Sequence, residues 1–282
     1  MIIVPARPED FPRLKEFLLP HEAECVQLCS YVRKNSENLF LIKKEKDDST
    51  AGVIYAKGTL LHCIPSLTDC AAELTKVLSA FLCAHSVKCV NGTLTASEFL
   101  KSLVISSSQK TCTQTNRYKL MTLTNAASLA VPQSPLCNDD EIRRLANPKH
   151  DADLLFELQK AYIAEEVVPA GKHPEDLEIR IILKQILKNQ ICLALFSDGE
   201  PVAKANTNAI GWSCVQLGGI YTHPLYRRNG YALHLVHTLC QRILRTGRTV
   251  TLYVKEKNTA ACGLYKKLGF TEYGDFEIAY FD

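Results

Sequence analysis

The sequence of 282 residues lacks any apolar run long enough to cross a membrane. Its longest apolar stretches, such as residues 191–196, suit a buried strand and fall far short of the roughly 20 residues that span a bilayer. The N-terminal stretch meets Arg7 too early for the core of a secretory signal peptide. We therefore expect a cytoplasmic protein with no membrane partner.

A large excess of charge of one sign is also missing, since 33 basic and 30 acidic residues leave a net charge of +3. A nonspecific nucleic-acid binder normally carries a concentrated basic surface, so no nucleic-acid partner is expected. With 46% hydrophobic and 22% charged residues, the composition is that of a globular protein and excludes wholesale disorder, collagen-like sequence and coiled coil.

Metal-site patterns are absent as well. None of the 12 cysteines forms a Cys-x-x-Cys pair, which argues against a zinc ribbon or a thioredoxin-like site, and we expect the thiols to stay reduced. Cys25 and Cys29 share one face of an expected helix and are interpreted as small core residues. His234 and His237 lie one turn apart without a third ligand, so no metal is expected.

The chain divides near Pro132 and Pro135, which interrupt any periodic pattern, and we expect domains at residues 1–132 and 133–282. Apolar periodicity predicts the same order of elements in both halves. In the first half we expect helices over 22–32 and around 74–82, and strands at 39–42, 51–56, 87–90 and 118–123.

In the second half we expect helices around 154–162, 179–187, 230–245 and 259–268, and strands at 191–196, 201–205, 214–222, 250–254 and 276–281. Asp198-Gly199 predicts a hairpin turn between the first two of these strands. Alternating helices and strands indicate a mixed α/β fold. The repeated order favours two diverged copies of one fold, each with its own mixed sheet and connected near residues 131–138.

The most informative segment runs from Leu217 to Ala232. A strand ends at Thr222, Pro224 prevents its continuation, and a polar turn opens onto an amphipathic helix. The N–H groups of a first helical turn lack intrahelical partners, and the helix dipole favours negative charge there. Gly230 leaves room for a phosphate to approach the backbone. This segment predicts an anion site.

Further along the chain stand Asn258, Ala261, Leu264-Tyr265 and Gly269-Phe270. Together with Arg227-Arg228-Asn229-Gly230-Tyr231-Ala232, this pattern resembles the GNAT superfamily of acyl-CoA-dependent N-acetyltransferases. The hallmarks of that superfamily are an Arg/Gln-x-x-Gly-x-Gly/Ala turn and a later Asn-x-x-Ala-x-x-Leu-Tyr-x-x-x-Gly-Phe. The resemblance covers about residues 138–282 and implies a GNAT-type fold there, with a degenerate copy in the first half.

The resemblance also implies site residues. Arg227 and the backbone amides of residues 228–232 would hold the pyrophosphate of acetyl-CoA, the co-substrate. The strand edge at Ile220, Tyr221 and Thr222 would pair with the pantetheine and place an N–H near the thioester carbonyl, where negative charge develops. Asn258 would contact the coenzyme arm, and Tyr265 would protonate the departing thiolate.

The resemblance does not single out one residue as the general base that takes the proton of the amine. Some GNAT members carry a glutamate where this chain has Gln216, which can hold a water but cannot accept a proton usefully. Glu165 and Glu166 are the substitutes, each with a solvated helix end as the alternative, and His223 is a further candidate because its ordinary pKa suits base chemistry. Cys262 leaves a covalent intermediate formally open.

The first half has neither motif. Residues 61–68, at the position of the anion turn, contain no glycine, so this half is expected to have lost coenzyme binding and to shape the acceptor site. The sequence therefore predicts acetyl transfer from acetyl-CoA to a primary amine by direct attack. The acceptor and the oligomeric state stay open. The alternatives are a non-catalytic coenzyme-binding module and an interaction protein that keeps only the fold.

Overall fold

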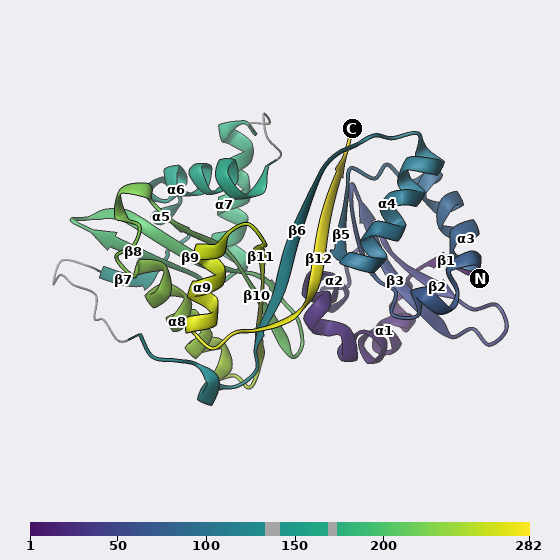
Figure 1. Cartoon of the computed structure of the whole chain (residues 1–282), viewed down its shortest axis with the longest axis horizontal. Coiled ribbons are helices and arrows are strands. Elements are labelled where there is room, and N and C mark those ends of the chain that lie inside the picture. The colour runs from purple at the N-terminus through teal and green to yellow at the C-terminus, as the bar shows by residue number, and fades with distance from the viewer. Residues whose placement is uncertain (133–141, 169–173) are drawn as a thin grey trace.

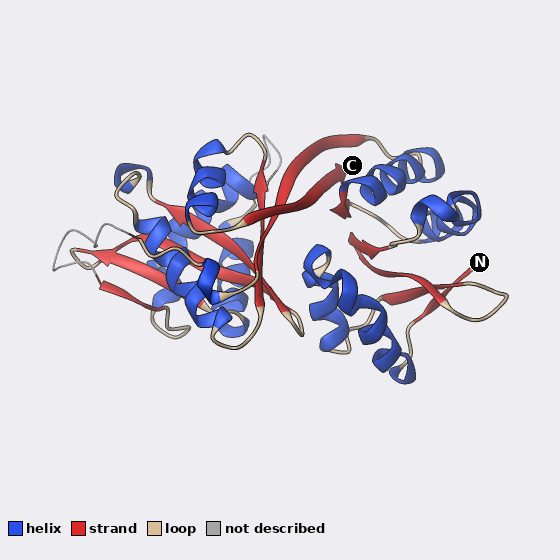
Figure 2. Ribbon diagram, turned by 60° about the horizontal axis from the view of Figure 1, so that its bottom comes forward, coloured by secondary structure: helices blue, strands red, loops and turns tan. Residues whose placement is uncertain are grey.

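A computed structural model of the protein describes residues 1–132, 142–168 and 174–282. Two lobes are joined by a pair of long strands, β6 (Cys112–Leu123) and β12 (Thr271–Phe281), which run side by side at the centre of the molecule (Figures 1 and 2). The mixed α/β class predicted from the sequence is confirmed. No helix of the described residues is both long and apolar enough to cross a bilayer.

Both halves follow one order of elements. The first half contains β1 (Ile2–Pro5), α1 (Phe11–Leu18), α2 (Val26–Arg33), β2 (Leu39–Lys43), β3 (Thr50–Lys57), β4 (Thr59–Cys63), α3 (Ala71–Ala84), β5 (Cys89–Thr93), α4 (Leu94–Ser108) and β6. The second half contains β7 (Ile142–Leu145), α5 (Asp151–Leu154), α6 (Phe156–Tyr162), α7 (Asp176–Asn189), β8 (Cys192–Ser197), β9 (Glu200–Ile210), β10 (Cys214–Thr222), α8 (Tyr231–Leu244), β11 (Thr249–Lys255), α9 (Thr259–Lys267) and β12. The repeat inferred from the sequence is therefore present.

The strands of the described residues form one continuous sheet of twelve, in the order β1-β2-β3-β4-β5-β12-β6-β11-β10-β9-β8-β7. The expectation of two separate sheets is wrong, because the halves exchange their last strands. Strand β12 pairs antiparallel with β5, and β6 pairs antiparallel with β11. The pairing of β6 with β12 then covers two sheet edges that separate halves would leave unpaired. The predicted connection near residues 131–138 lies mostly outside the described residues, and the division at 132/133 stays a prediction.

Successive side chains of a strand point to opposite faces of the sheet, so the core to which each belongs shows which helices cover that face. Leu193 and Leu195 of β8 belong to the core that includes residues of α8 and α9. Cys192 and Ala194 belong instead to the core that includes residues of α5, α6 and α7. In the first half, Leu60 packs with α3 and α4. Helices α3, α4, α8 and α9 thus cover one face, and α1, α2 and α5–α7 cover the other.

Each half contains one parallel pair of strands, and each pair is short. Strands β4 and β5 pair only through residues 59–61 and 89–91, and β10 and β11 only through residues 214–217 and 249–252. Beyond these residues the neighbouring strands separate. Each half therefore has an opening between its fourth and fifth strands, and the candidate site lies at the second of these openings.

Candidate functional site

The open edge of β10 is the first component of the site. Residues 218–222 of β10 do not pair with β11, and the strand beside them is β9. Backbone groups on the side that faced β11 therefore have no partner strand, and an extended ligand can take that place by adding hydrogen bonds in the manner of a strand. The open edge contains Ile220, Tyr221 and Thr222, the three strand residues that the sequence motif predicts.

A bulge at Gly219 begins this open edge. Gly219 has φ +57°, and the register between β9 and β10 shifts between Gly218 and Tyr221. A Cβ at position 219 would lie 2.0 Å from Oδ1 of Asn206 and 2.9 Å from Nζ of Lys204, so only glycine fits. The Gly219 N–H donates to the Tyr162 hydroxyl (3.3 Å), and its carbonyl accepts from Lys204 Nζ (2.9 Å).

The predicted turn follows β10 and leads into α8. A short 3₁₀ turn, η6 (Pro224–Tyr226), is followed by Arg228 at φ +69° and Gly230 at φ +80°, and α8 begins at Tyr231. A Cβ at Gly230 would meet nothing closer than His234 Cδ2 at 3.8 Å, so the helix N-terminus is open at that point. The strand, turn and helix N-terminus predicted from residues 217–232 are therefore all present.

The predicted base His223 has a structural role in the same turn. Its Nδ1 accepts a hydrogen bond from the Leu225 N–H at 3.4 Å and caps η6. Arg227 also bonds locally, because its Nε donates to the Thr222 carbonyl at 3.1 Å. These contacts fix the path of the turn between β10 and α8.

Asn258 and Tyr265 lie on the other side of the opening. Asn258 is the N-cap of α9, where its Oδ1 accepts from the Ala261 N–H (3.1 Å) and its Nδ2 donates to Glu166 Oε1 (3.3 Å). Tyr265 is buried and lies edge-on to Phe270. Burial, with nearby Tyr162 and Glu166, raises the pKa of the Tyr265 phenol above its ordinary value.

Both glutamates proposed as bases are ion-paired. They lie on the π-helical turn η5 (Ile163–Val167) that continues α6. Glu165 Oε2 is 2.7 Å from Arg227 Nη2 and accepts from the Tyr221 hydroxyl at 3.2 Å. Glu166 Oε2 is 3.1 Å from Lys255 Nζ. Glu165 and Glu166, the two candidate bases, thus contact Arg227 and Asn258, which the motif assigns to the coenzyme.

Gln216 lies on β10 just before the opening, in the part of the strand that still pairs with β11. It is buried and is opposite Thr251 of β11, where the two strands still pair. Its Oε1 has no hydrogen-bond partner among the described residues, and neither does the Thr251 hydroxyl. Cys262 is half-buried on α9, and burial raises the pKa of its thiol, which keeps it protonated and weakens it as a nucleophile.

Three polar residues of this site were missed by reasoning from the sequence: Tyr162, Lys204 and Lys255. Lys204 interrupts the apolar run Val202-Ala203-Lys204-Ala205 of an expected strand, and a lysine inside such a run is the signal that could have identified it. Lys204 is fully buried. Tyr162 and Lys255 carried no comparable signal, because their partners are distant in sequence.

The corresponding opening in the first half is filled. His62 of β4 occupies it, since a Cβ at Gly92 of β5 would lie 2.2 Å from His62 Nε2. That nitrogen is 3.0 Å from the Ser97 hydroxyl of α4. The first half therefore lacks the glycine turn, and the His62 side chain lies where its fourth and fifth strands separate.

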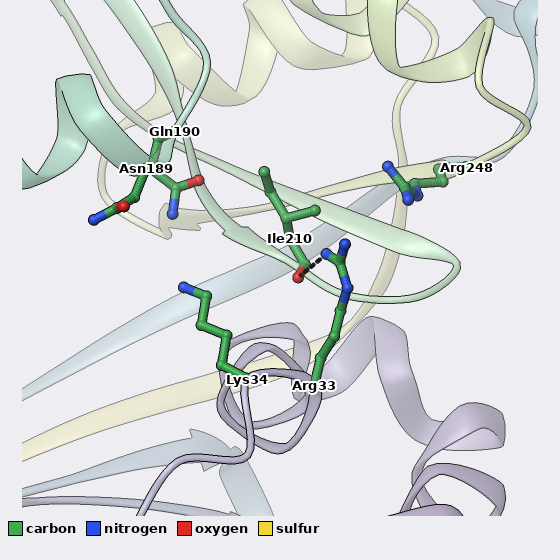
Figure 3. A pocket seen from close by; sticks show the side chains of 6 residues that line it. All are labelled: Arg33, Lys34, Asn189, Gln190, Ile210 and Arg248. Atoms are coloured by element: carbon green, nitrogen blue, oxygen red, sulfur yellow. Dashed lines mark hydrogen bonds between the residues drawn. The ribbon is translucent and has the colours of Figure 1, made fainter. Parts of the chain in front are cut away.

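A separate basic pocket of about 430 Å³ lies near the start of β10, at the end opposite the turn. Figure 3 shows Arg33, the last residue of α2, and the adjacent Lys34 on one side and Arg248 on the other. Arg33 Nη1 donates to the Ile210 carbonyl (3.1 Å) and Arg248 Nε to the Trp212 carbonyl (3.1 Å). The two arginines therefore bind carbonyl groups at the turn between β9 and β10.

Comparison with known proteins identifies the fold. The FR47-like protein family model matches residues 200–279. A GCN5-related N-acetyltransferase structure from Sphaerobacter thermophilus is similar over 99% of this chain and 94% of its own, with a TM-score of 0.61 at 16% identity. The chain has a GNAT superfamily fold.

The GNAT fold extends over both halves. A tandem GNAT protein from the clavulanic acid biosynthesis pathway aligns with 99% of this chain and 97% of its own, with a TM-score of 0.60 at 12% identity. A Drosophila protein aligns with 100% of this chain and 98% of its own, with a TM-score of 0.72 at 15% identity. No curated protein matches the sequence. The first half is thus a GNAT-like copy, as the repeat of elements predicted.

Proposed function

We propose that the protein is an N-acetyltransferase that transfers an acetyl group from acetyl-CoA to a primary amine. The observation that carries the proposal is the continuity between the open edge of β10 and the turn before α8. Residues 218–222 offer a backbone edge with no neighbouring strand on the side of β11, and residues 227–232 lead from it to an unobstructed helix N-terminus. An elongated ligand with a phosphate group near one end suits this shape.

The described residues fit coenzyme A. Its pantetheine would lie along Ile220–Thr222, and its pyrophosphate would meet the amides of residues 228–232, where the helix dipole favours negative charge. Gly230 leaves the space that this approach needs. Arg227 would exchange Glu165 for the pyrophosphate, because its ion pair with that carboxylate is at the surface, with both side chains more than two-fifths exposed.

The chemistry follows from this placement. The amine nitrogen would attack the thioester carbonyl carbon, and the Ile220 N–H would stabilise the negative charge that develops on the carbonyl oxygen. When the carbon–sulfur bond breaks, the thiolate would take the proton of the Tyr265 phenol. The amine would lose its proton to Glu165 or Glu166, directly or through water, and the Tyr265 phenolate would then regain a proton by way of water, which restores the enzyme. The products are an amide and free coenzyme A.

The alternative is a coenzyme-binding module without turnover. It is favoured by Gln216 at the position of a family glutamate and by the ion pairs that hold both Glu165 and Glu166. The two functions separate in an assay of thiol release with a panel of amines. Binding of acetyl-CoA without thiol release would support the module, and failure to bind would indicate that only the fold is retained.

The coenzyme site itself is tested by Gly230→Asp. Acetyl-CoA should raise the melting temperature of the parent protein by mass action. The aspartate should abolish this rise, because it places a side chain and a like charge against the pyrophosphate. Gly199→Asp is the matched control, since Gly199 has a similar φ of +82°, has no atom near an added Cβ, and lies in the distant β8–β9 turn. An unchanged rise in Gly230→Asp would overturn the assignment of residues 227–232.

A further inference from the structure

We propose that Lys204 is a positioning residue that holds the Gly219–Ile220 peptide so that its N–H points into the groove as the oxyanion donor. This inference rests on the proposed function, because it concerns the group that would stabilise the transition state. It starts from a feature that the acetyl-transfer chemistry does not by itself require, namely a fully buried lysine below the bulge of β10.

The surroundings of Lys204 are those of a bound ammonium ion. Its Nζ donates to the Gly219 carbonyl (2.9 Å) and to Asn206 Oδ1 (3.1 Å), and lies 5.1 Å from the centre of the Tyr162 ring. Two oxygen acceptors and an aromatic face replace the water that burial removes. Burial lowers the pKa of Lys204 to about 8, so the side chain is still mostly charged at pH 7. A nitrogen that donates in this way cannot also accept a proton from the substrate.

The geometry of one peptide unit connects Lys204 to the groove. The Gly219 carbonyl and the Ile220 N–H belong to the same planar trans peptide, so they point in opposite directions. Lys204 Nζ lies beside the Tyr162 ring of α6 and binds the carbonyl, so the N–H points away from Nζ and from Tyr162. Next to this peptide β10 no longer pairs with β11, so no strand competes for the N–H. The lysine thus fixes the direction of the N–H that the resemblance assigns to the thioester oxygen.

Two further contacts make this arrangement rigid. The N–H of Gly219 is held by the Tyr162 hydroxyl at 3.3 Å, so neighbouring peptide groups on both sides of the Gly219 Cα have partners. Asn206 is oriented in turn, because its Nδ2 donates to the Thr207 carbonyl at 2.9 Å. A charged donor on a carbonyl also polarises the peptide and strengthens its N–H as a donor. The ammonium therefore orients the oxyanion donor and increases its strength.

The test compares Lys204→Met, which removes charge and donor, with Lys204→Gln, which keeps an amide donor without charge. Lys101→Met is the control for loss of a partly buried ammonium, because Lys101 of α4 binds the buried Glu277 of β12 at 2.7 Å, away from the Gly219 bulge. For each variant we would measure kcat, the dissociation constant of acetyl-CoA, and hydrogen exchange of a peptide covering residues 214–223.

We expect kcat to fall about 10- to 100-fold in Lys204→Met and less in Lys204→Gln, with acetyl-CoA affinity nearly unchanged. Exchange in residues 214–223 should rise in Lys204→Met and not in Lys101→Met. The proposal would be overturned if Lys204→Met kept both the kcat and the hydrogen exchange of the parent protein. It would also be overturned if Lys101→Met lost as much kcat as Lys204→Met. If Lys204→Met does not fold, Lys204→Gln decides by the same criteria.

Failure of the proposed function is distinguishable from failure of this inference. If the parent protein releases no thiol with any amine, the acetyltransferase assignment is wrong. Hydrogen exchange then still decides the role of Lys204. Faster exchange confined to residues 214–223 would support its hold on the bulge, and unchanged exchange would overturn it.

Discussion

Under the proposed function, Tyr265 is the residue whose removal would separate catalysis from binding. Its phenol is buried beside Phe270, and burial raises its pKa, so the hydroxyl keeps its proton over the range in which the protein would work. A protonated phenol near the sulfur can donate to the leaving thiolate, whereas it contributes little to the affinity for a neutral thioester. Chemistry and binding should therefore respond differently to its removal.

In Tyr265→Phe we expect kcat to fall about 100-fold while the dissociation constant of acetyl-CoA changes little, because the ring and its packing remain. Steady-state kinetics and calorimetric titration measure the two quantities. Tyr273→Phe is the control, since Tyr273 is half exposed on β12 and should leave both unchanged. If Tyr265→Phe turns over like the parent with chemistry rate-limiting, Tyr265 is only a packing residue.

At this scale the sequence predicted the residues of the two local motifs and missed the contacts between them. Gly230 and Asn258 were predictable because a turn at positive φ and a helix N-cap are set by neighbouring residues. The pairing of Glu165 with Arg227 was not, because it joins positions separated by a helix and three strands. The apolar run around Lys204 was a local sign of its burial, but its contact with Tyr162 was hidden, since it depends on α6 packing over β9.

At the scale of elements, the opening between β4 and β5 shows why the first half is not expected to bind a coenzyme. His62 fills it and is completely buried, with Nε2 at the Ser97 hydroxyl and Nδ1 without a partner among the described residues. Burial lowers the pKa of His62 to about 4, because a charged imidazole would lose its hydration there. The filled groove therefore requires a neutral histidine.

This gives a prediction for stability against pH. In the unfolded chain His62 should titrate near its ordinary value of 6.5, so between pH 6.5 and 4 the unfolded chain binds a proton that the folded chain does not. The free energy of unfolding should fall as the pH drops through this window, by about 2 kcal/mol from this group between pH 7 and pH 5. Urea unfolding at the two pH values measures the difference.

His62→Gln should remove this part of the pH dependence, and His150→Gln should not, because His150 is exposed. An equal loss of stability between pH 7 and pH 5 in the parent and in His62→Gln would contradict the assignment.

Several elements were predicted closely and others were missed. Helix α8 was expected over 230–245 and spans Tyr231–Leu244, because its apolar residues recur at helical spacing. The helix expected over 22–32 begins at Val26, since a 3₁₀ turn, η2 (Leu19–Glu24), and the extended φ of Cys25 precede it. Helix α4 was missed, because its serines and threonines weaken the apolar periodicity of Leu94–Ser108.

At the scale of the whole molecule, the exchange of β6 and β12 is the feature that the sequence did not reveal. Local patterns identify a strand but not its partner, and here the partners lie more than 100 residues away in the chain, as in the pairing of Phe276 with Thr93. Because each half supplies a strand to the sheet of the other, Figure 1 shows the two long strands crossing between the lobes. Neither half is expected to unfold alone.

A buried carboxylate adds a second connection between the halves. Glu22, which precedes α2, accepts hydrogen bonds from the backbone N–H groups of Trp212 (2.5 Å) and Ser213 (3.0 Å) in the β9–β10 turn. A Cβ at Gly211 would lie 1.9 Å from Glu22 Oε1, so the turn is shaped around this side chain. Trp212 is the one tryptophan of the chain and packs against the core of the first half. Its fluorescence therefore reports on the junction.

We therefore expect one cooperative unfolding transition, with the same midpoint by Trp212 fluorescence and by far-ultraviolet circular dichroism. Glu22→Gln should lower the free energy of unfolding by about 2 kcal/mol, because it removes a charged acceptor from two backbone N–H groups. Both signals should shift together, and Glu16→Gln, at an exposed site on α1, should shift neither. A fluorescence change that precedes the loss of secondary structure would mean that the junction opens first, and the exchanged strands would then not bind the halves into one folding unit.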